Sequence, residues 1–315
     1  MGRWHAHAVA HSGHIVSAVI DPDATRASLL ARAHPAARTS TTLESSEPVD
    51  VVHICTPLAT HGALVQQALD RGSHVIAEKP LVPSSVETAA LLDRATTAGL
   101  LLVPVHQFLF QRGVRHTQRH LDDIGPLLHA DVVACTAGAA GRAEAEQDRV
   151  AVEVLPHPLS LLSRLVSPRI AEVDWNVRHA RAGELRADGV LAGVSVSVLI
   201  STGGRPTTNQ LRIIGQRGTI TIDLFHGFAV VTRGRTTRAG KIAQPFVSGA
   251  ALLGAASANL VRRTATRETA YPGLRELVRR FYAAAATGGI APISAAETVA
   301  VAQALERIQR LMSHA

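Results

Sequence analysis

The sequence predicts two domains: an α/β domain with a Rossmann-type parallel sheet, and an α+β domain with a largely antiparallel open sheet. Strands and helices alternate in the first half, which is typical of parallel strands joined by helical crossovers. From about residue 127 the strands follow one another closely, which favours antiparallel pairing. The length of 315 residues also exceeds one ordinary core. We place the domains at residues 1–107 and 108–315, with an amphipathic C-terminal helix at about 294–312 that packs back on the fold.

The composition indicates a globular protein with a basic surface. Hydrophobic residues make up 46% of the chain, and the formal net charge is +7. The arginines are scattered without interleaved aromatic residues for base stacking, so we expect no nucleic-acid partner. No signal peptide is visible, and no run reaches the ~18 apolar residues of a membrane span. The uncharged run 246–261 is rich in small residues and predicts a packed loop and helix.

Two cysteines bear on compartment and metal binding. Cys55 and Cys135 lie in apolar, strand-like runs without the spacing of metal ligands. Such residues are most simply buried thiols of a protein in a reducing compartment. We therefore expect a cytoplasmic protein without a bound metal or a membrane partner.

Strands and helices of the first domain are marked by β-branched runs and capping residues. Residues 15–20 predict a strand, and residues 24–33 a helix. The continuous β-branched run 49–56 predicts a strand buried on both faces. Helices are predicted at 61–71 and at 84–98, the second capped by Ser84 or Ser85.

The stretch from His74 to Pro80 places a lysine just after the end of a short strand. Residues 74–77 form the strand, and Pro80 cannot extend a central strand, so the chain turns just after Lys79. In an open parallel sheet, the carboxyl ends of the strands are where ligands bind. A lysine before a proline is also common in solvated loops, so the surrounding motifs must decide.

The first residues of the chain predict a helix that has no strand before it. In a dinucleotide-binding fold, a strand and a glycine-rich turn precede the first helix, and an acid about 20 residues on binds the adenosine ribose. Asp21 stands in the place of that acid, but no strand precedes Gly2. We therefore expect an N-terminally incomplete domain. Either the chain begins late, or the protein lacks the element that holds the pyrophosphate.

Three motifs resemble the Gfo/Idh/MocA family, named after glucose-fructose oxidoreductase and inositol dehydrogenase. They are the run VDVVHICTPLATH at 49–61, the tripeptide EKP at 78–80, and GRWHA at 2–6, which is similar to the end of the family's glycine motif. The resemblance implies a bound dinucleotide. The residues that it implies for cofactor binding are Gly2, Arg3, Trp4, His5, Asp21, Thr56, Pro57, His61, Glu78 and Lys79.

The implied cofactor is NAD. A carboxylate at Asp21 would repel the 2′-phosphate of NADP. Arg26 lies close enough in the sequence to leave NADP open.

The chemistry of the second domain centres on residues 153–160. If this segment is helical, Glu153 and His157 share a face, so a carboxylate and an imidazole can converge on one small ligand. The family pattern is an Asp, then His four positions later, then Asp three positions on. Here Glu153 and Ser160 replace the two Asp residues, while His157 matches. A histidine beside prolines is also often structural, and that alternative stays open.

The resemblance implies an NAD(P)-dependent oxidoreductase. Hydride would pass between the nicotinamide and the hydroxyl or carbonyl carbon of a sugar, polyol or related small metabolite. Lys79 would hold the substrate oxygen, His157 would remove its proton, and Glu153 would bind a second hydroxyl or orient His157. The further substrate contacts that we expect are Gln107, Arg112 and Ser160.

The sequence also leaves open a non-redox function and indicates a second copy of the chain as a partner. Without a pyrophosphate turn, the chain would instead be a non-redox or inactive relative that serves as a binding or assembly module. The resemblance also implies a homo-oligomer that pairs through the sheet of the second domain.

Overall fold

The computed structural model describes residues 1–136, 138–234, 237–268 and 270–312. The chain divides into two compact units, Met1–Val105 with Leu274–Ala302, and His106–Gly273 with the residues from Gln303 onward. The predicted domains, 1–107 and 108–315, differ from these units by the segment Leu274–Ala302. This segment belongs to the first unit because helix α9 (Leu274–Thr287) packs on helix α1 (Gly2–His11) and buries four large side chains, Leu274, Leu277, Val278 and Phe281.

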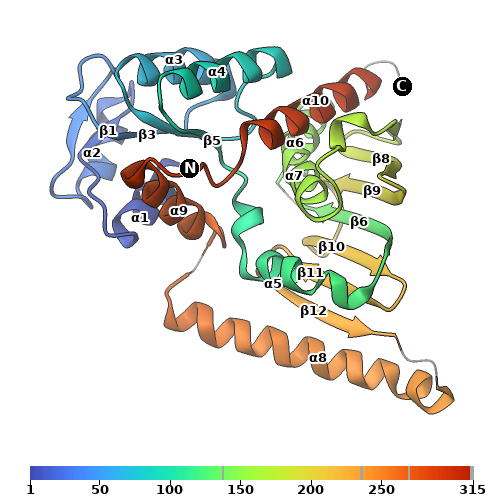
Figure 1. The fold of residues 1–315 in the computed structure, drawn as a ribbon. Coiled ribbons are helices and arrows are strands. Elements are labelled where there is room, and N and C mark those ends of the chain that lie inside the picture. The colour runs from blue at the N-terminus through green and yellow to red at the C-terminus, as the bar shows by residue number, and fades with distance from the viewer. Residues whose placement is uncertain (137, 235–236, 269, 313–315) are drawn as a thin grey trace. The chain divides into compact units, whose positions relative to one another are not determined.

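The first unit contains two parallel sheets with helices on both sides. In one sheet β1 pairs with β2, and in the other β4 lies between β3 and β5. These strands are β1 (Ala18–Ile20), β2 (Arg38–Ser40), β3 (Val51–Ile54), β4 (His74–Ala77) and β5 (Leu102–Pro104). The other helices of the unit are α2 (Ala24–Ala31), α3 (His61–Asp70) and α4 (Ser85–Thr97), with a 3₁₀ turn η1 (Leu58–Thr60). Figure 1 shows α3 and α4 on one side of β3–β5, and α1 and α9 on the other.

Burial and capping explain why these elements form where they do. The central strand β4 carries Val75, Ile76 and Ala77, which are fully buried, as expected for a strand covered on both faces. The hydroxyl oxygen of Ser84 accepts a hydrogen bond from the backbone N–H of Glu87, so the predicted cap of α4 is confirmed. The predicted parallel α/β domain is therefore confirmed. That an element is missing before α1 stays a prediction.

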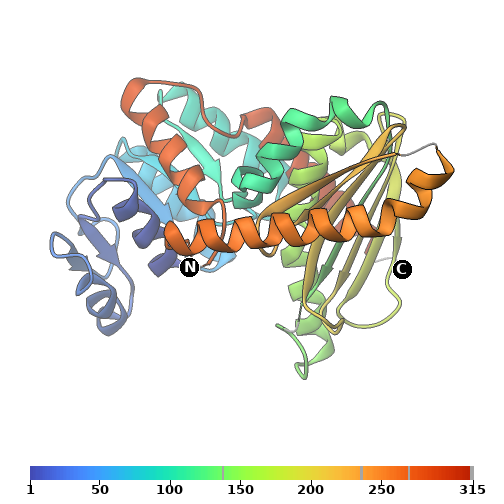
Figure 2. The ribbon, with the colours of Figure 1, turned by 90° about the horizontal axis from the view of Figure 1, so that it is seen from below.

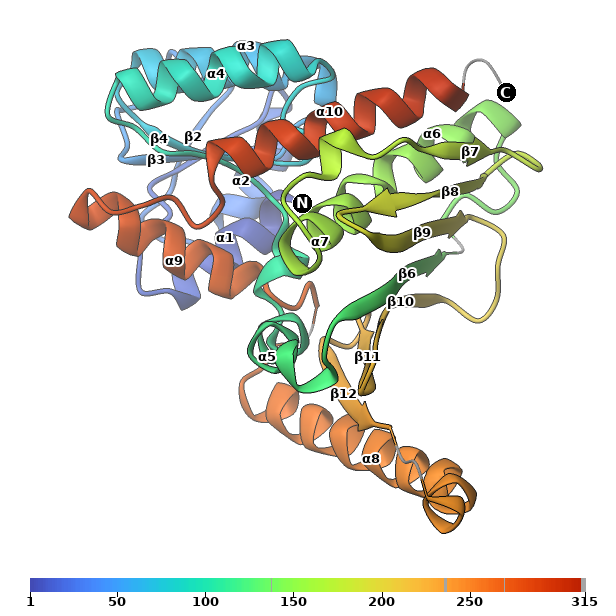
Figure 3. The same ribbon diagram turned by 45° about the vertical axis from the view of Figure 1, so that its right-hand side comes forward.

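The second unit is built on one seven-stranded mixed sheet. Its strand order is β12-β11-β10-β6-β9-β8-β7, and every neighbouring pair is antiparallel except β6 with β9. The strands are β6 (Leu127–Cys135), β7 (Asn176–Arg178), β8 (Glu184–Leu191), β9 (Val194–Ser201), β10 (Thr208–Gly215), β11 (Gly218–Asp223) and β12 (Phe228–Arg233). Figure 3 shows them side by side. The largely antiparallel sheet predicted for this domain is confirmed.

Helices of the second unit cover this sheet unevenly. Its helices are α5 (Arg112–His120), α6 (Glu144–Val154), α7 (Pro156–Leu165) and α8 (Arg238–Ala265), with 3₁₀ turns η2 (Gln107–Phe110), η3 (Asp122–Ile124) and η4 (Ile170–Glu172). Helix α5 packs on β11 and β12, and α6 packs on β8 and β9. Helix α10 (Ala295–Met312) contributes residues to both units. The amphipathic C-terminal helix predicted at 294–312 is thus present.

The run 246–261 lies inside the single long helix α8, which spans 28 residues. Figure 2 shows α8 running along the sheet beside β12, with which it is in contact. The prediction of a packed loop followed by a helix is therefore wrong in its first part. Alanine and leucine dominate the run and favour helix enough to override its glycines. Among the described residues, no helix combines the length and apolarity needed to cross a bilayer.

Gly113→Ala is expected to destabilise the second unit by about 2 kcal/mol, because overpacking a tight contact strains the backbone. A Cβ atom at Gly113 would lie 2.6 Å from the carbonyl carbon of Phe228, and the Gly113 N–H donates to the Gly227 carbonyl at 3.0 Å. Urea unfolding measures the change. Gly249→Ala on α8 is the control, because nothing lies within 4 Å of its added Cβ, and it should leave the free energy of unfolding unchanged or higher.

Candidate cofactor and substrate site

The predicted ligand edge of the first unit lies where β3 and β4 end. The register pairs Ile54 with Ala77, so Thr56 and the Glu78–Lys79 pair follow neighbouring strands at the same edge. The backbone N–H of Glu78 donates to the Ile54 carbonyl at 2.9 Å, which extends the pairing by one residue. Parallel strands therefore bring together the cofactor residues predicted after β3 and after β4.

His61 connects the two loops that leave this edge. Its ring is 2% exposed, with Nε2 2.9 Å from the Thr56 carbonyl and Nδ1 3.1 Å from the carbonyls of Pro80 and Leu81. The Thr56 hydroxyl also accepts a hydrogen bond from the Thr60 hydroxyl at 2.7 Å. His61 thus holds the loops after β3 and β4 in place. A direct contact of His61, Thr56 or Pro57 with a cofactor stays a prediction.

A buried ion pair joins α1 to the end of β4. The ring of His5 is 2% exposed, and its Nε2 lies 3.2 Å from a carboxylate oxygen of Glu78. Burial opposes the charge on His5, but Cys55 and Glu78 outweigh it and raise the pKa of His5 to about 9. Burial likewise acts to raise the pKa of Glu78, yet His5 and then Lys79 hold it below its usual value. Both groups are therefore charged near neutral pH.

The ion pair continues into a polar network that the sequence did not reveal. Nδ1 of His5 lies 2.8 Å from Nδ1 of His53, and Nε2 of His53 lies 3.1 Å from the Tyr282 hydroxyl. Burial and then the charge on His5 lower the pKa of His53 well below its usual value, so His53 is neutral. Burial, followed by Asp50, raises the pKa of Tyr282. A histidine within the β-branched run of β3 was the only signal in the sequence.

Lys79 is partly buried directly after Glu78, and its charge helps to lower the pKa of that carboxylate. It is one of only two lysines in the chain, the other being Lys241 on α8. The strand end and the charged pair beside it therefore fix a single ammonium at the predicted ligand edge.

Asp21 and the start of α1 supply the remaining predicted cofactor residues. Asp21 follows β1, and one of its carboxylate oxygens accepts the backbone N–H of Asp23 at 2.9 Å. The Arg26 guanidinium pairs with Asp23 at 3.3 Å rather than with Asp21. At the start of α1, the Arg3 guanidinium lies 5.0 Å from the centre of the Trp4 ring. Cofactor binding by Gly2, Arg3 and Trp4 stays a prediction.

In the second unit, the predicted catalytic histidine packs on an aromatic ring. His157, on the first turn of α7, is 9% exposed, and its ring stacks on Phe108 of η2 with centres 4.3 Å apart. Glu153 lies near the end of α6, is half exposed, and pairs with Arg149 at 3.2 Å. The two helices are separated only by Leu155, which keeps helical backbone angles. The predicted helical arrangement of Glu153 and His157 is therefore present with a break between them.

The three predicted substrate contacts have different surroundings. Gln107, next to Phe108, is 6% exposed, and its side-chain oxygen has no hydrogen-bond partner among the described residues. Ser160 is fully buried and donates its hydroxyl to the His157 carbonyl at 2.9 Å. Arg112 is exposed at the start of α5. Lys79 and His157 belong to different units, so their convergence on one substrate stays a prediction.

The family comparison bears on the first unit. Residues 1–106 match the model of the oxidoreductase family with an NAD-binding Rossmann fold, Gfo/Idh/MocA. Where the structure describes the chain, no three His, Cys, Asp or Glu residues are grouped so that they could hold a metal ion.

Curated relatives match part of the chain. The dTDP-3,4-didehydro-2,6-dideoxy-alpha-D-glucose 3-reductase of Streptomyces violaceoruber is 32% identical over 190 residues, which cover 56% of this chain and 54% of the relative. The D-xylose 1-dehydrogenase (NADP(+)) 2 of Haloferax volcanii is 38% identical over 106 residues, a third of each chain. The matches thus span about half or less of the length of these relatives.

Solved structures of two dehydrogenases share the fold of this chain along nearly its whole length. A levoglucosan dehydrogenase in complex with NADH and levoglucosan has a TM-score of 0.79 at 17% identity, covering 100% of this chain and 95% of that one. The UDP-N-acetylglucosamine 3-dehydrogenase GnnA from Acidithiobacillus ferrooxidans has a TM-score of 0.74 at 19% identity, with 98% and 93% covered. At these identities the likeness shows the two-domain fold.

Proposed function

We propose that this chain is an NAD(P)-dependent oxidoreductase that transfers hydride between the nicotinamide and the hydroxyl or carbonyl carbon of a sugar, polyol or related small metabolite. The observation that carries the proposal is the edge of the first unit, where Lys79 and the buried His5–Glu78 ion pair meet the end of β4. The match of residues 1–106 to the model of an NAD-binding oxidoreductase family supports it. So do the relatives, which are named as dehydrogenases and reductases.

Residues that follow β1 and β4 support the binding of a dinucleotide. Asp21 engages Asp23 through one carboxylate oxygen, and its position after β1 suits a ribose hydroxyl. Glu78 is kept ionised by His5 and offers an acceptor beside Lys79. The nicotinamide, when bound, supplies or accepts the hydride.

Each proposed catalytic residue has one task. The Lys79 ammonium stabilises negative charge that develops on the substrate oxygen. The His157 imidazole takes up the hydroxyl proton in the oxidation direction and returns it in reduction. Glu153 binds a second hydroxyl or orients His157, and Gln107, with an unpartnered oxygen, accepts a substrate hydroxyl. We also propose that Arg112 and Ser160 contribute to substrate binding.

Asp21→Ala is expected to narrow the preference for NADH over NADPH by about tenfold, because a carboxylate near the 2′-phosphate costs on the order of 1–2 kcal/mol. The measurement is the ratio of the two dissociation constants in the wild type and the variant. Asp23→Ala is a poor control because it removes the cap of α2, so the exposed Asp70→Ala serves instead. An unchanged ratio in Asp21→Ala would remove this residue from the cofactor site.

An NADH fluorescence titration of the 315-residue chain tests the proposed function directly. Binding, followed by turnover with one member of a panel of sugars and inositols, is the expected result. Absence of binding at about 1 mM NADH, well above usual cofactor affinities, would favour the non-redox binding or assembly module instead.

The proposal also includes pairing of two copies of the chain and a cytoplasmic location. The seven-stranded sheet exposes Val190 on β8 and Leu199 on β9, which are 62% and 39% exposed, and the Arg212–Asp131 ion pair joins β10 to β6. We propose that this sheet pairs two copies of the chain, and light scattering gives the mass that decides it. Both cysteines are free thiols, which supports a reducing, cytoplasmic location.

A further inference from the structure

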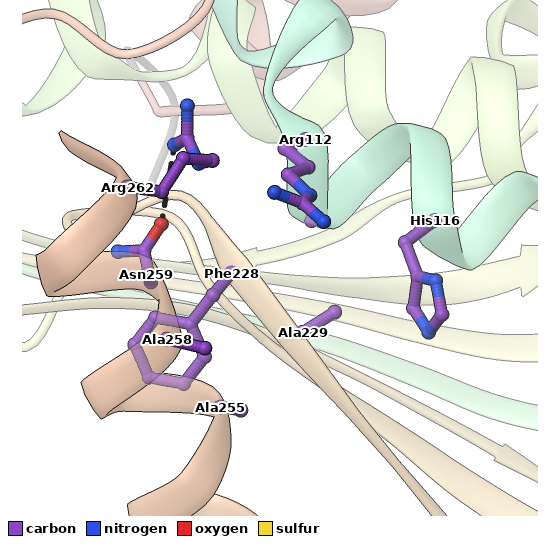
Figure 4. A pocket seen from close by; sticks show the side chains of 9 residues that line it. Arg112, His116, Phe228, Ala229, Ala255, Ala258, Asn259 and Arg262 are labelled. Atoms are coloured by element: carbon purple, nitrogen blue, oxygen red, sulfur yellow. Dashed lines mark hydrogen bonds between the residues drawn. The ribbon is translucent and has the colours of Figure 1, made fainter. Parts of the chain in front are cut away.

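A pocket lies within the second unit where α5, β12 and α8 meet. Its volume is about 190 Å³, several times the share of one water molecule in the liquid. Figure 4 shows side chains from all three elements around it. The lining residues are Arg112, Gly113, His116, Phe228, Ala229, Ala255, Ala258, Asn259 and Arg262. Except for Arg112, none of these residues is used in the proposed redox reaction.

The polar part of this pocket is cationic. The positive charge comes from Arg112 on α5 and Arg262 on α8, the imidazole of His116 on α5 also lines the pocket, and no Asp or Glu does. Arg112 forms no ion pair with any residue that the structure describes. Helix α5 adds to the positive potential because it carries three arginines and no acidic residue. Burial, then His120, Arg119 and Arg112, lower the pKa of His116, while Asp123 acts in the opposite direction.

Arg262 is held in place at the pocket wall by two partners. One terminal nitrogen of its guanidinium lies 3.2 Å from a carboxylate oxygen of Glu268, and the other donates to the side-chain oxygen of Asn259 at 3.2 Å. The Asn259 amide nitrogen in turn donates to the His226 carbonyl at 3.0 Å. The third nitrogen, Nε of Arg262, is buried without an acceptor among the described residues. The guanidinium is therefore oriented before any ligand arrives, and one of its N–H groups still lacks an acceptor.

The rest of the pocket wall is apolar. The Phe228 ring and three alanine side chains form it, and Figure 4 shows Phe228, Ala229, Ala255 and Ala258 beside the cationic groups. A free ion would leave these surfaces without a contact. A ligand with an anionic end and a small organic body matches both parts.

We propose that this pocket binds the phosphate group of a small phosphorylated molecule. The donors come from two helices: the Arg112 guanidinium and His116 from α5, and the Arg262 guanidinium from α8. Donors that approach from separate elements suit a tetrahedral oxyanion, whereas a planar carboxylate is usually gripped by one guanidinium fork. The inference concerns the second unit alone and does not depend on cofactor binding at the first.

Isothermal titration calorimetry of the full chain with phenyl phosphate tests this proposal. One binding site per chain is expected, with Arg112→Gln weakening binding by about tenfold or more, because a charged hydrogen bond is lost. Arg119→Gln is the matched control. It removes the same charge from the same helix but does not line the pocket, so it should weaken binding less than about threefold. Equal losses in the two variants, or no binding in the wild type, would overturn the proposal.

A second variant tests the shape of the pocket without changing charge. Ala255→Leu fills the apolar wall and should weaken phenyl phosphate binding by about tenfold, whereas Ala256→Leu, the next residue of α8, should not. Binding of phenyl phosphate that is unaffected by Ala255→Leu would place the ligand elsewhere.

Two further ligands identify the source of the anion. If phenyl phosphate binds more tightly than inorganic phosphate, the natural ligand is a phosphorylated metabolite. If the two bind equally tightly, the pocket is a site for free phosphate. Benzoate should bind far more weakly. Benzoate binding as tight as that of phenyl phosphate would overturn the assignment to phosphate.

Discussion

Lys79→Ala is expected to lower kcat by about 10²–10³-fold, the usual loss when a donor that stabilises charge on a reacting oxygen is removed. The side chain follows the central strand β4, and the ammonium acts beside Glu78, whose carboxylate His5 keeps ionised. The fold should be retained because the charge lies at the edge of the sheet rather than in its core. Steady-state kinetics with the substrate found in the panel, together with an NADH titration, measure the two effects separately. A dissociation constant for NADH that rises in the variant would show that Lys79 also contributes to cofactor binding.

Two further variants are measured in the same assay, one as a matched control and one at the second proposed catalytic residue. Lys241→Ala removes the only other lysine, which lies exposed on α8, and should leave kcat unchanged. His157→Ala should also abolish turnover, since it removes the proposed base and leaves Phe108 without its stacking partner. Wild-type turnover in both Lys79→Ala and His157→Ala would contradict the site assignment. Wild-type turnover in Lys79→Ala alone would restrict the catalytic role to the second unit.

Local sequence signals predicted the elements of the first unit well. The β-branched run at 49–56 contains β3, and Ser84 caps α4 at the predicted position. Strands covered on both faces need continuous apolar runs, and helix caps need short polar side chains, so both signals are local. The closely spaced strands after residue 127 likewise predicted a sheet, although the parallel pairing of β6 with β9 has no local signal.

Contacts between distant segments could not be predicted in the same way. Tyr282 reaches His53 across 229 positions, and α9 joins the first unit only because the chain returns to it. The sequence identified His5 and Glu78 individually from their motifs, but not the ion pair between them. The pocket of Arg112 and Arg262 combines α5 with α8, and no spacing in the sequence relates those helices. Such sites depend on tertiary packing, which a single sequence leaves open.

Glu78→Gln is expected to lower the free energy of unfolding by about 2–3 kcal/mol near pH 6, because it removes one partner of a buried ion pair and leaves His5 less well compensated. Part of the stabilisation of protonated His5 comes from Cys55 and remains in the variant. Urea unfolding at several pH values measures the loss. Glu47→Gln is the control, since its pair with Arg38 in the same unit is largely exposed and should contribute less than about 1 kcal/mol.

The pH dependence of this loss separates the ion pair from a general packing defect. The folded-state pKa of His5 is raised to about 9 from an ordinary 6.5, so its contribution is complete below 6.5 and disappears as the pH rises towards 9. The pKa of Glu78 is lowered from its ordinary 4.5, so its contribution is present above 4.5 and is lost as the pH falls through the folded-state value. The wild type should therefore exceed Glu78→Gln most between pH 4.5 and 6.5 and least above pH 9. A difference that is the same at about pH 6 and about pH 9.5 would mean that the carboxylate stabilises the unit by packing rather than by its charge.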